Sequence, residues 1–106
     1  MDKKTKIGII GAGQMGEALI RGMLNARIIS SGQISTSDKN KKRLEEIGKK
    51  YRIRAYTDNS RLAEGSDILI LSVKPRDMVD VLTGISSALR ERTLLISIAA
   101  GVRVKL

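Results

Sequence analysis

The sequence predicts an α/β fold in which a parallel sheet of about five strands is doubly wound, with helices on both faces. Short apolar runs rich in β-branched residues alternate with amphipathic stretches along the whole chain, a pattern typical of successive strand–helix units. A glycine-rich motif stands at the first strand-to-helix junction. The 106 residues, 42% of them hydrophobic, are enough for one domain with an aliphatic core.

Five apolar runs are the expected strands, at residues 6–10, 34–37, 52–56, 68–73 and 94–99. The third run alternates charged and apolar residues, whereas the others are mainly apolar, so we place it at an edge of the sheet. Doubly wound domains order their strands 3-2-1-4-5-6. A sixth strand would follow Leu106, so we expect the fifth strand to have an exposed edge.

Helices are expected between the strands, at residues 15–26, 41–49, 60–64 and 76–90. Short polar side chains accept hydrogen bonds from the free N–H groups of a first helical turn. We therefore expect Asp38 to cap the second helix and Asn59 or Ser60 to cap the third. Pro75 stands where the first turn of the fourth helix tolerates a missing N–H.

The composition excludes several kinds of chemistry. Cysteine and histidine are both absent, which excludes disulfides, thiolate metal sites, a cysteine nucleophile and histidine as general base. We expect no metal site. No apolar run reaches the ~20 residues that a membrane span needs, and the lack of cysteine is typical of reducing compartments. We therefore expect a cytoplasmic protein that does not contact a membrane.

The motif Gly11-Ala12-Gly13-Gln14-Met15-Gly16 fits the pattern G-x-G-x-x-G, directly after the first strand and at the start of the first helix. There the loop N–H groups and the positive end of the helix face one point, which suits a pyrophosphate. Gly11 is expected to form the tight turn, Gly13 to let phosphates approach the backbone, and Gly16 to allow close helix–strand contact. This predicts a Rossmann-type dinucleotide site; the alternative is a glycine turn without a ligand.

Two opposed signals after the second strand bear on the choice of dinucleotide. Asp38 lies 22 residues after Gly16, where an acidic residue binds the adenosine ribose hydroxyls of NAD. Four basic residues follow it, and they either surround the 2′-phosphate of NADP or form a solvated helix face; they are Lys39, Lys41, Lys42 and Arg43. They open a stretch, residues 39–54, that carries +6 of the net charge of +9.

The other candidates follow the fourth and fifth strands, because open α/β sheets bind ligands at the carboxyl ends of their strands. They are Val73-Lys74-Pro75 and Ala99-Ala100-Gly101. Lys74 is either a phosphate or ribose contact or an ordinary surface lysine. The small residues near Ala100 either admit a flat group or reflect tight packing.

Taken together, these stretches resemble one family. Residues 6–19, Thr57-Asp58-Asn59, Ser72-Val73-Lys74-Pro75 and residues 96–102 are similar to the amino-terminal half of the pyrroline-5-carboxylate reductases. The specific part is V-K-P followed at this separation by S-I-A-A-G. The resemblance implies reduction of 1-pyrroline-5-carboxylate to L-proline, the last step of proline biosynthesis, by hydride transfer from NADPH or NADH.

The resemblance also implies residue roles, with NADP as the expected cofactor and NAD as the alternative. Asp38, beside Lys39, would contact the adenosine ribose or its 2′-phosphate, although the family often has Ser, Thr or Asn there. Asn59 would lie near the adenosine and Ala100 near the nicotinamide. The pyrophosphate loop would be lined by Ile10, Gly11, Ala12, Gly13, Gln14 and Met15, with Gly16 completing the cofactor-binding motif. The dinucleotide would be bordered by Ser72, Val73, Lys74 and Pro75.

The family continues into a helical domain that forms the dimer and holds the imino-acid substrate. We therefore expect residues 1–106 to be the cofactor-binding half. This half would contain no catalytic residue and would be inactive alone. It would be compatible with assembly into a homo-oligomer. One alternative is a non-catalytic NAD(P)-binding module or redox sensor. Another, suggested by the charge, is a nucleic-acid binder; because Tyr51 and Tyr56 are the only aromatic residues, nucleic acid is not an expected partner.

Overall fold

Residues 2–98, which a computed structural model describes, contain one sheet of five parallel strands. The order of the strands in the sheet is β3-β2-β1-β4-β5. The strands are β1 (Ile7–Ile10), β2 (Ile34–Ser37), β3 (Arg54–Tyr56), β4 (Ile68–Leu71) and β5 (Leu94–Ser97). Both the predicted order and the edge position of the third strand are confirmed.

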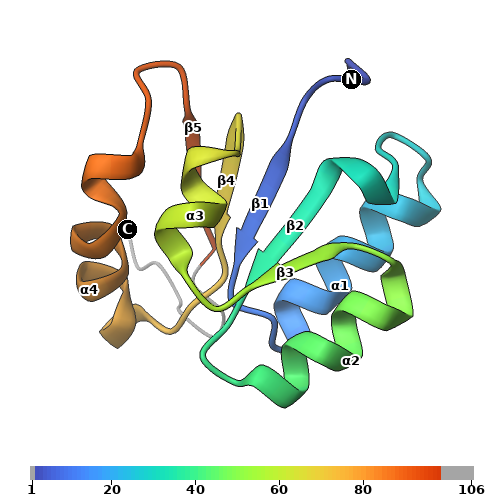
Figure 1. The fold of residues 1–106 in the computed structure, drawn as a ribbon, viewed down its shortest axis with the longest axis horizontal. Helices are drawn as coiled ribbons and strands as arrows, with labels where there is room; N and C mark the ends of the chain where they lie inside the picture. The colour runs from blue at the N-terminus through green and yellow to red at the C-terminus, as the bar shows by residue number, and fades with distance from the viewer. Residues whose placement is uncertain (1, 99–106) are drawn as a thin grey trace, which may run out of the picture.

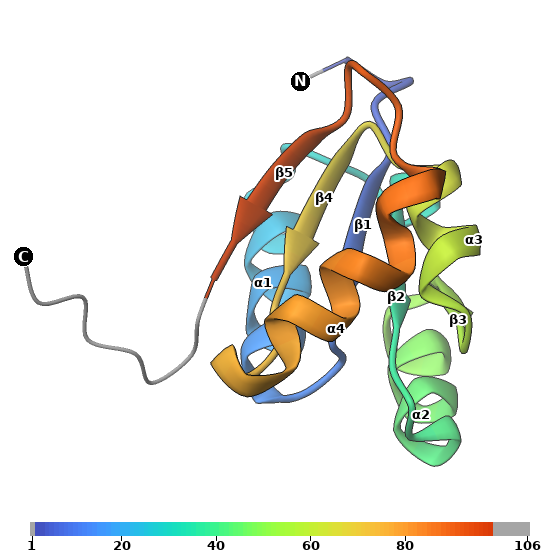
Figure 2. The ribbon, with the colours of Figure 1, turned by 90° about the vertical axis from the view of Figure 1, so that its left-hand side faces the viewer.

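Within these residues, four α-helices and two short 3-10 turns join the strands. They are α1 (Gln14–Asn25), η1 (Ser31–Gln33), α2 (Lys41–Tyr51), α3 (Asn59–Glu64), α4 (Pro75–Ile85) and η2 (Ser86–Ala88). Figures 1 and 2 show α1 and α2 on one face of the sheet and α3 and α4 on the other. The predicted doubly wound α/β architecture is confirmed.

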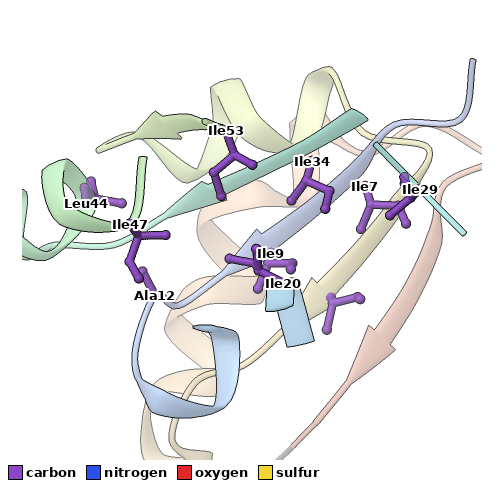
Figure 3. Close-up of a cluster of buried hydrophobic side chains, with 10 residues drawn as sticks. Ile7, Ile9, Ala12, Ile20, Ile29, Ile34, Leu44, Ile47 and Ile53 are labelled. Atoms are coloured by element: carbon purple, nitrogen blue, oxygen red, sulfur yellow. The ribbon is translucent and has the colours of Figure 1, made fainter. Parts of the chain in front are cut away.

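Each face of the sheet has its own apolar layer, because successive residues of a strand point to opposite faces. Ile7 and Ile9 of β1 belong to the cluster beneath α1 and α2 (Figure 3). Ile10 belongs to the opposite cluster, with Leu62 of α3 and Ile85 of α4. Full burial of an isoleucine or leucine side chain stabilises the fold by about 2 kcal/mol, so both layers of helices are held firmly to β1.

Gly8 lets α3 approach β1 closely. A Cβ atom at this position would lie 2.3 Å from Ser66 Oγ and 2.7 Å from Leu62 Cδ2. A larger residue would displace the Ser66 and Leu62 side chains and disturb the second cluster.

Two helix caps differ from those predicted. The Asn40 side chain, not Asp38, caps α2 by accepting the Arg43 N–H at 3.1 Å. Asp58, one residue before the predicted candidates, caps α3 by accepting the Ser60 N–H at 2.9 Å. The Asp38 carboxylate is instead engaged by two backbone N–H groups, one of them in the glycine-rich loop. Pro75 begins α4, as predicted.

Several element ends also differ from the prediction. Arg52 has a left-handed φ of 56° and closes α2, so β3 begins at Arg54 rather than at residue 52. The fourth helix ends at Ile85 instead of residue 90, because Gly84 and the two serines of η2 form helices poorly. The predicted end of the fifth strand, Ala99, lies outside the described residues.

The outer strand β5 is exposed, as predicted. Leu94 is 54% exposed, and Leu95 and Ile96 are each 39% exposed. In the part of the chain that the structure describes, no helix is long and apolar enough to cross a bilayer.

Candidate functional site

A groove of about 580 Å³ lies at the carboxyl edge of the sheet. It is lined by residues that follow β1, β2, β3 and β4 and by the beginning of α4. From β1 the chain proceeds to one side of the sheet, through β2 and β3, and it returns to the other side at β4. The groove therefore lies at the point where strand order reverses, which is where doubly wound sheets bind ligands.

The structure brings most of the predicted residues together in this groove. Its lining includes Ile10, Gly11, Gly13, Asp38, Lys39, Asn59, Ser72, Val73 and Lys74. Five predicted residues lie beside it instead of lining it: Ala12 and Gly16 are buried, and Gln14, Met15 and Pro75 are exposed. Ala100 lies outside the described residues.

The three motif glycines meet three different steric demands. Gly11 has a φ of 104°, and a Cβ there would lie 2.2 Å from the Ser72 carbonyl oxygen. A Cβ on Gly16 would lie 2.1 Å from the Gly11 carbonyl oxygen and 3.7 Å from Ile9 Cγ2. Among the described residues, a Cβ on Gly13 would meet nothing within 4 Å. The fold therefore requires glycine at 11 and 16, whereas at 13 glycine only keeps space open.

The space beside Gly13 adjoins free hydrogen-bond donors. Gly13 is the N-cap of α1, and as a glycine it has no side chain that could cap the helix. The first N–H groups of an α-helix have no intrahelical partner, and the helix dipole makes this end positive. The geometry at Gly13 therefore suits an anionic group, as the motif predicts.

The backbone N–H and carbonyl of Ala12 are both held by side chains that follow β2. The Ala12 N–H donates to Asp38 Oδ2 at 2.8 Å. The Ala12 carbonyl accepts a hydrogen bond from Arg43 Nε at 2.6 Å. The other oxygen of Asp38 accepts the Asn40 N–H at 2.9 Å.

Glu17, in the first turn of α1, accepts hydrogen bonds from three side chains of α2. The donors are the Tyr51 hydroxyl, Lys50 Nζ at 2.9 Å and Arg43 Nη2 at 2.7 Å. These bonds, Tyr51's first, lower the pKa of Glu17 from its ordinary 4.5 to about 2. The same contact raises the pKa of Lys50. Glu17 thus remains a carboxylate, and its side chain is only 14% exposed.

The basic residues after Asp38 are not equivalent. Lys39 lines the groove, whereas Lys41, Lys42 and Arg43 are not among its lining residues in the described structure. Arg43 is bound to Ala12 and Glu17. For Lys39, Lys41 and Lys42 the role of phosphate neighbour therefore stays a prediction, whereas Arg43 is already engaged by a loop carbonyl and a carboxylate.

Sequence reasoning missed several groove residues. They are Ser37, Thr57, Arg76, Asp77, Asp80 and Val81. Ser37 ends β2 and its hydroxyl donates to Asn59 Oδ1 at 2.6 Å, so its place at the carboxyl end of a strand was a usable signal. The last four occupy one face of the first two turns of α4. Their spacing indicates a common face but does not reveal what that face meets.

Comparison with known proteins is consistent with this geometry. Residues 6–101 match the family described as NADP oxidoreductase, coenzyme F420-dependent. The pyrroline-5-carboxylate reductase of Methanosarcina acetivorans is 44% identical over 100 residues, which are 94% of this chain and 37% of that relative. This chain thus spans little more than a third of the curated relative it matches.

Two solved structures are also similar. One is a pyrroline carboxylate reductase of Plasmodium falciparum with NADP bound, with a TM-score of 0.80 and 33% identity, over 98% of this chain and 37% of that one. The other is a pyrroline-5-carboxylate reductase from Coxiella burnetii, with a TM-score of 0.85 and 27% identity, over 94% and 37% of the two chains.

Proposed function

The chain belongs to the family described as NADP oxidoreductase, coenzyme F420-dependent, and from this premise we propose that it is the dinucleotide-binding part of a pyrroline-5-carboxylate reductase. The identity of 44% with one such enzyme and 33% with another supports the choice within the family. The bound dinucleotide supplies the hydride in this reaction. The residues that line the groove bind and orient the dinucleotide.

The observation that carries the proposal is the open space at Gly13. Gly11 and Gly16 are explained by contacts within the fold, but Gly13 is not, since its Cβ would meet no atom of residues 2–98 within 4 Å. Its φ of −75° is also one that any residue adopts. Glycine is an acceptable N-cap in any helix, but here it also lets a ligand approach the N-terminus of α1 closely, and a pyrophosphate matches the charge of that helix end.

The groove residues fit the rest of a dinucleotide. Asp38 and Lys39 lie together after β2, where the adenosine ribose and its 2′-phosphate would be held. Asn59 would contact the adenosine side, and Ser72, Val73 and Lys74 would border the dinucleotide from the end of β4. Ala100 would lie near the nicotinamide.

We propose NADP(H) as the preferred cofactor, with NAD(H) as the second choice. Both oxygens of Asp38 already accept backbone N–H groups, whereas Lys39 is exposed at the groove. The carboxylate is therefore partly engaged, and the cation is available to a phosphate. The NADP bound to the Plasmodium falciparum relative supports this choice.

Reduction of 1-pyrroline-5-carboxylate would need more than these residues. Binding of the imino acid would depend on segments corresponding to the rest of the longer relatives. In the alternative function, a non-catalytic NAD(P)-binding module, the dinucleotide would occupy the same groove.

Calorimetric titration of the 106-residue chain with NADPH and then NADH tests the proposal. Saturable binding of NADPH is expected. Gly13→Val should abolish it, because the new side chain would occupy the phosphate position. The matched control is Gly22→Val, since a Cβ on Gly22 of α1 also meets nothing within 4 Å in the part of the chain that the structure describes. Binding by Gly13→Val equal to that of the parent would refute the proposed site.

A further inference from the structure

We propose that Arg43 is a positioning residue that holds the glycine-rich loop in its nucleotide-binding shape and that it does not itself bind phosphate. The inference rests on the proposed function, since it concerns how the same loop is prepared for a dinucleotide. It assigns a task to a basic residue whose position after β2 suggests a phosphate ligand instead.

The first argument is that both backbone hydrogen-bonding groups of one loop residue, Ala12, are engaged, so the two peptide planes on either side of it are fixed. Ala12 is fully buried, its N–H donates to Asp38, and its carbonyl accepts from Arg43 Nε at 2.6 Å. Ala12 directly precedes Gly13, the N-cap of α1. Rotation of the Ala12–Gly13 peptide would break the bond to a charged donor, so Arg43 fixes the direction in which the backbone enters Gly13.

The second argument is that Arg43 is itself held away from the groove. Its Nη2 donates to Glu17 Oε1 at 2.7 Å, and its Nη1 lies 3.9 Å from Glu46 Oε2. The planar guanidinium thus has protein partners on each of its three nitrogens. To bind a phosphate, Arg43 would have to leave a carboxylate that is only 14% exposed, which would be costly.

The third argument is that Glu17 is anchored independently of Arg43. Tyr51 and Lys50 donate to the other carboxylate oxygen, Oε2. Arg43 therefore joins three elements: the loop through Ala12, α1 through Glu17 and α2 through its own backbone. A loop fixed before the ligand arrives loses less conformational entropy on binding, so the arrangement should strengthen affinity for any dinucleotide.

The two possible roles of Arg43 predict different effects on the choice between NADPH and NADH. NADPH and NADH share the pyrophosphate and differ in the 2′-phosphate. A residue that shapes the pyrophosphate loop affects both equally, whereas a 2′-phosphate ligand affects only NADPH.

The test is calorimetric titration of the 106-residue chain and its Arg43→Met variant with NADPH and NADH at two salt concentrations. Loss of a hydrogen bond to a charged group should weaken binding of both coenzymes by the same factor, about tenfold. The ratio of the two affinities and the salt dependence should not change. The matched control is Lys49→Met, which removes the same charge from α2 at a side chain that is 78% exposed and pairs with Glu45.

Two results in this titration would overturn the inference. A loss confined to NADPH, with a shallower salt dependence, would make Arg43 a phosphate ligand. Unchanged affinities for both coenzymes would show that Arg43 has no role in binding.

Amide hydrogen exchange of the nucleotide-free chain separates this inference from the proposed function. If the parent binds neither coenzyme, the proposed function fails, but exchange still reports on the loop. Arg43→Met should speed exchange of the Ala12–Gly16 amides about tenfold and leave the β1 and β4 amides unchanged. Unchanged loop exchange, or an equal rise throughout the sheet, would overturn the inference.

Discussion

Substitution of Gly11 by alanine should destabilise the fold, whereas the same substitution two residues later should not. At Gly11 the new Cβ would lie 2.2 Å from the Ser72 carbonyl oxygen, and φ is 104°. Ordinary van der Waals contact begins near 3.4 Å, so the loop after β4 would have to move by about 1 Å. An alanine at this φ also costs on the order of 1–3 kcal/mol in backbone strain.

The expected loss for Gly11→Ala is therefore about 2–4 kcal/mol of unfolding free energy, strain and displacement together. Gly13→Ala meets neither cost, because its φ is −75° and its surroundings are open. Restriction of the unfolded chain favours alanine at position 13 by about 0.5 kcal/mol, but alanine is a poorer N-cap than glycine, so Gly13→Ala should be close to neutral. The pair thus separates what the fold needs from what a ligand needs.

Urea unfolding followed by circular dichroism measures both variants against the parent, with the free energies extrapolated to water. Equal slopes for the three proteins would show that the comparison is sound. The reasoning is refuted if Gly11→Ala is within 0.5 kcal/mol of the parent, or if the two variants lose the same stability.

Two further predictions concern charged residues. Because the pKa of Glu17 is about 2 in the fold and 4.5 ordinarily, its contribution to stability is complete above about pH 4.5 and is lost as the pH falls through 2. Urea unfolding at several pH values should therefore show a smaller loss between pH 5 and 2 for Glu17→Gln than for the parent, and parallel curves would contradict this. Lys39→Met should weaken NADPH binding about tenfold and leave NADH binding unchanged, and a calorimetric loss common to both coenzymes would argue against Lys39 as the 2′-phosphate contact.

The strand order, the doubly wound architecture and the place of the groove could be predicted from local patterns. Apolar runs identify buried parallel strands, and G-x-G-x-x-G between a strand and a helix fixes where a helix N-terminus meets the carboxyl edge. Gly11 is a clear case, because its positive φ follows from the turn the motif requires.

The hydrogen-bond partners of the polar residues could not be predicted in the same way. Asp38 and Asn40 are both good helix caps, and which of them acts depends on where α2 begins to within two residues. Arg43 contacts Ala12 across 31 residues of sequence, so no local pattern distinguishes it from the neighbouring lysines. The face of α4 that meets the groove depends likewise on how that helix packs.

The central place of β1 has a consequence for synthesis on the ribosome. One flank of β1 pairs with β2, but the other pairs with β4, where Ile7 is matched to Ile68. At the usual 5–20 residues per second, the intervening segment takes about 3–12 s to emerge. The contacts of Ala12 with Asp38 and Arg43 all lie in the portion translated first. The glycine-rich loop can therefore acquire its shape early, whereas the side of the groove that Ser72 lines forms only after β4 has been synthesised.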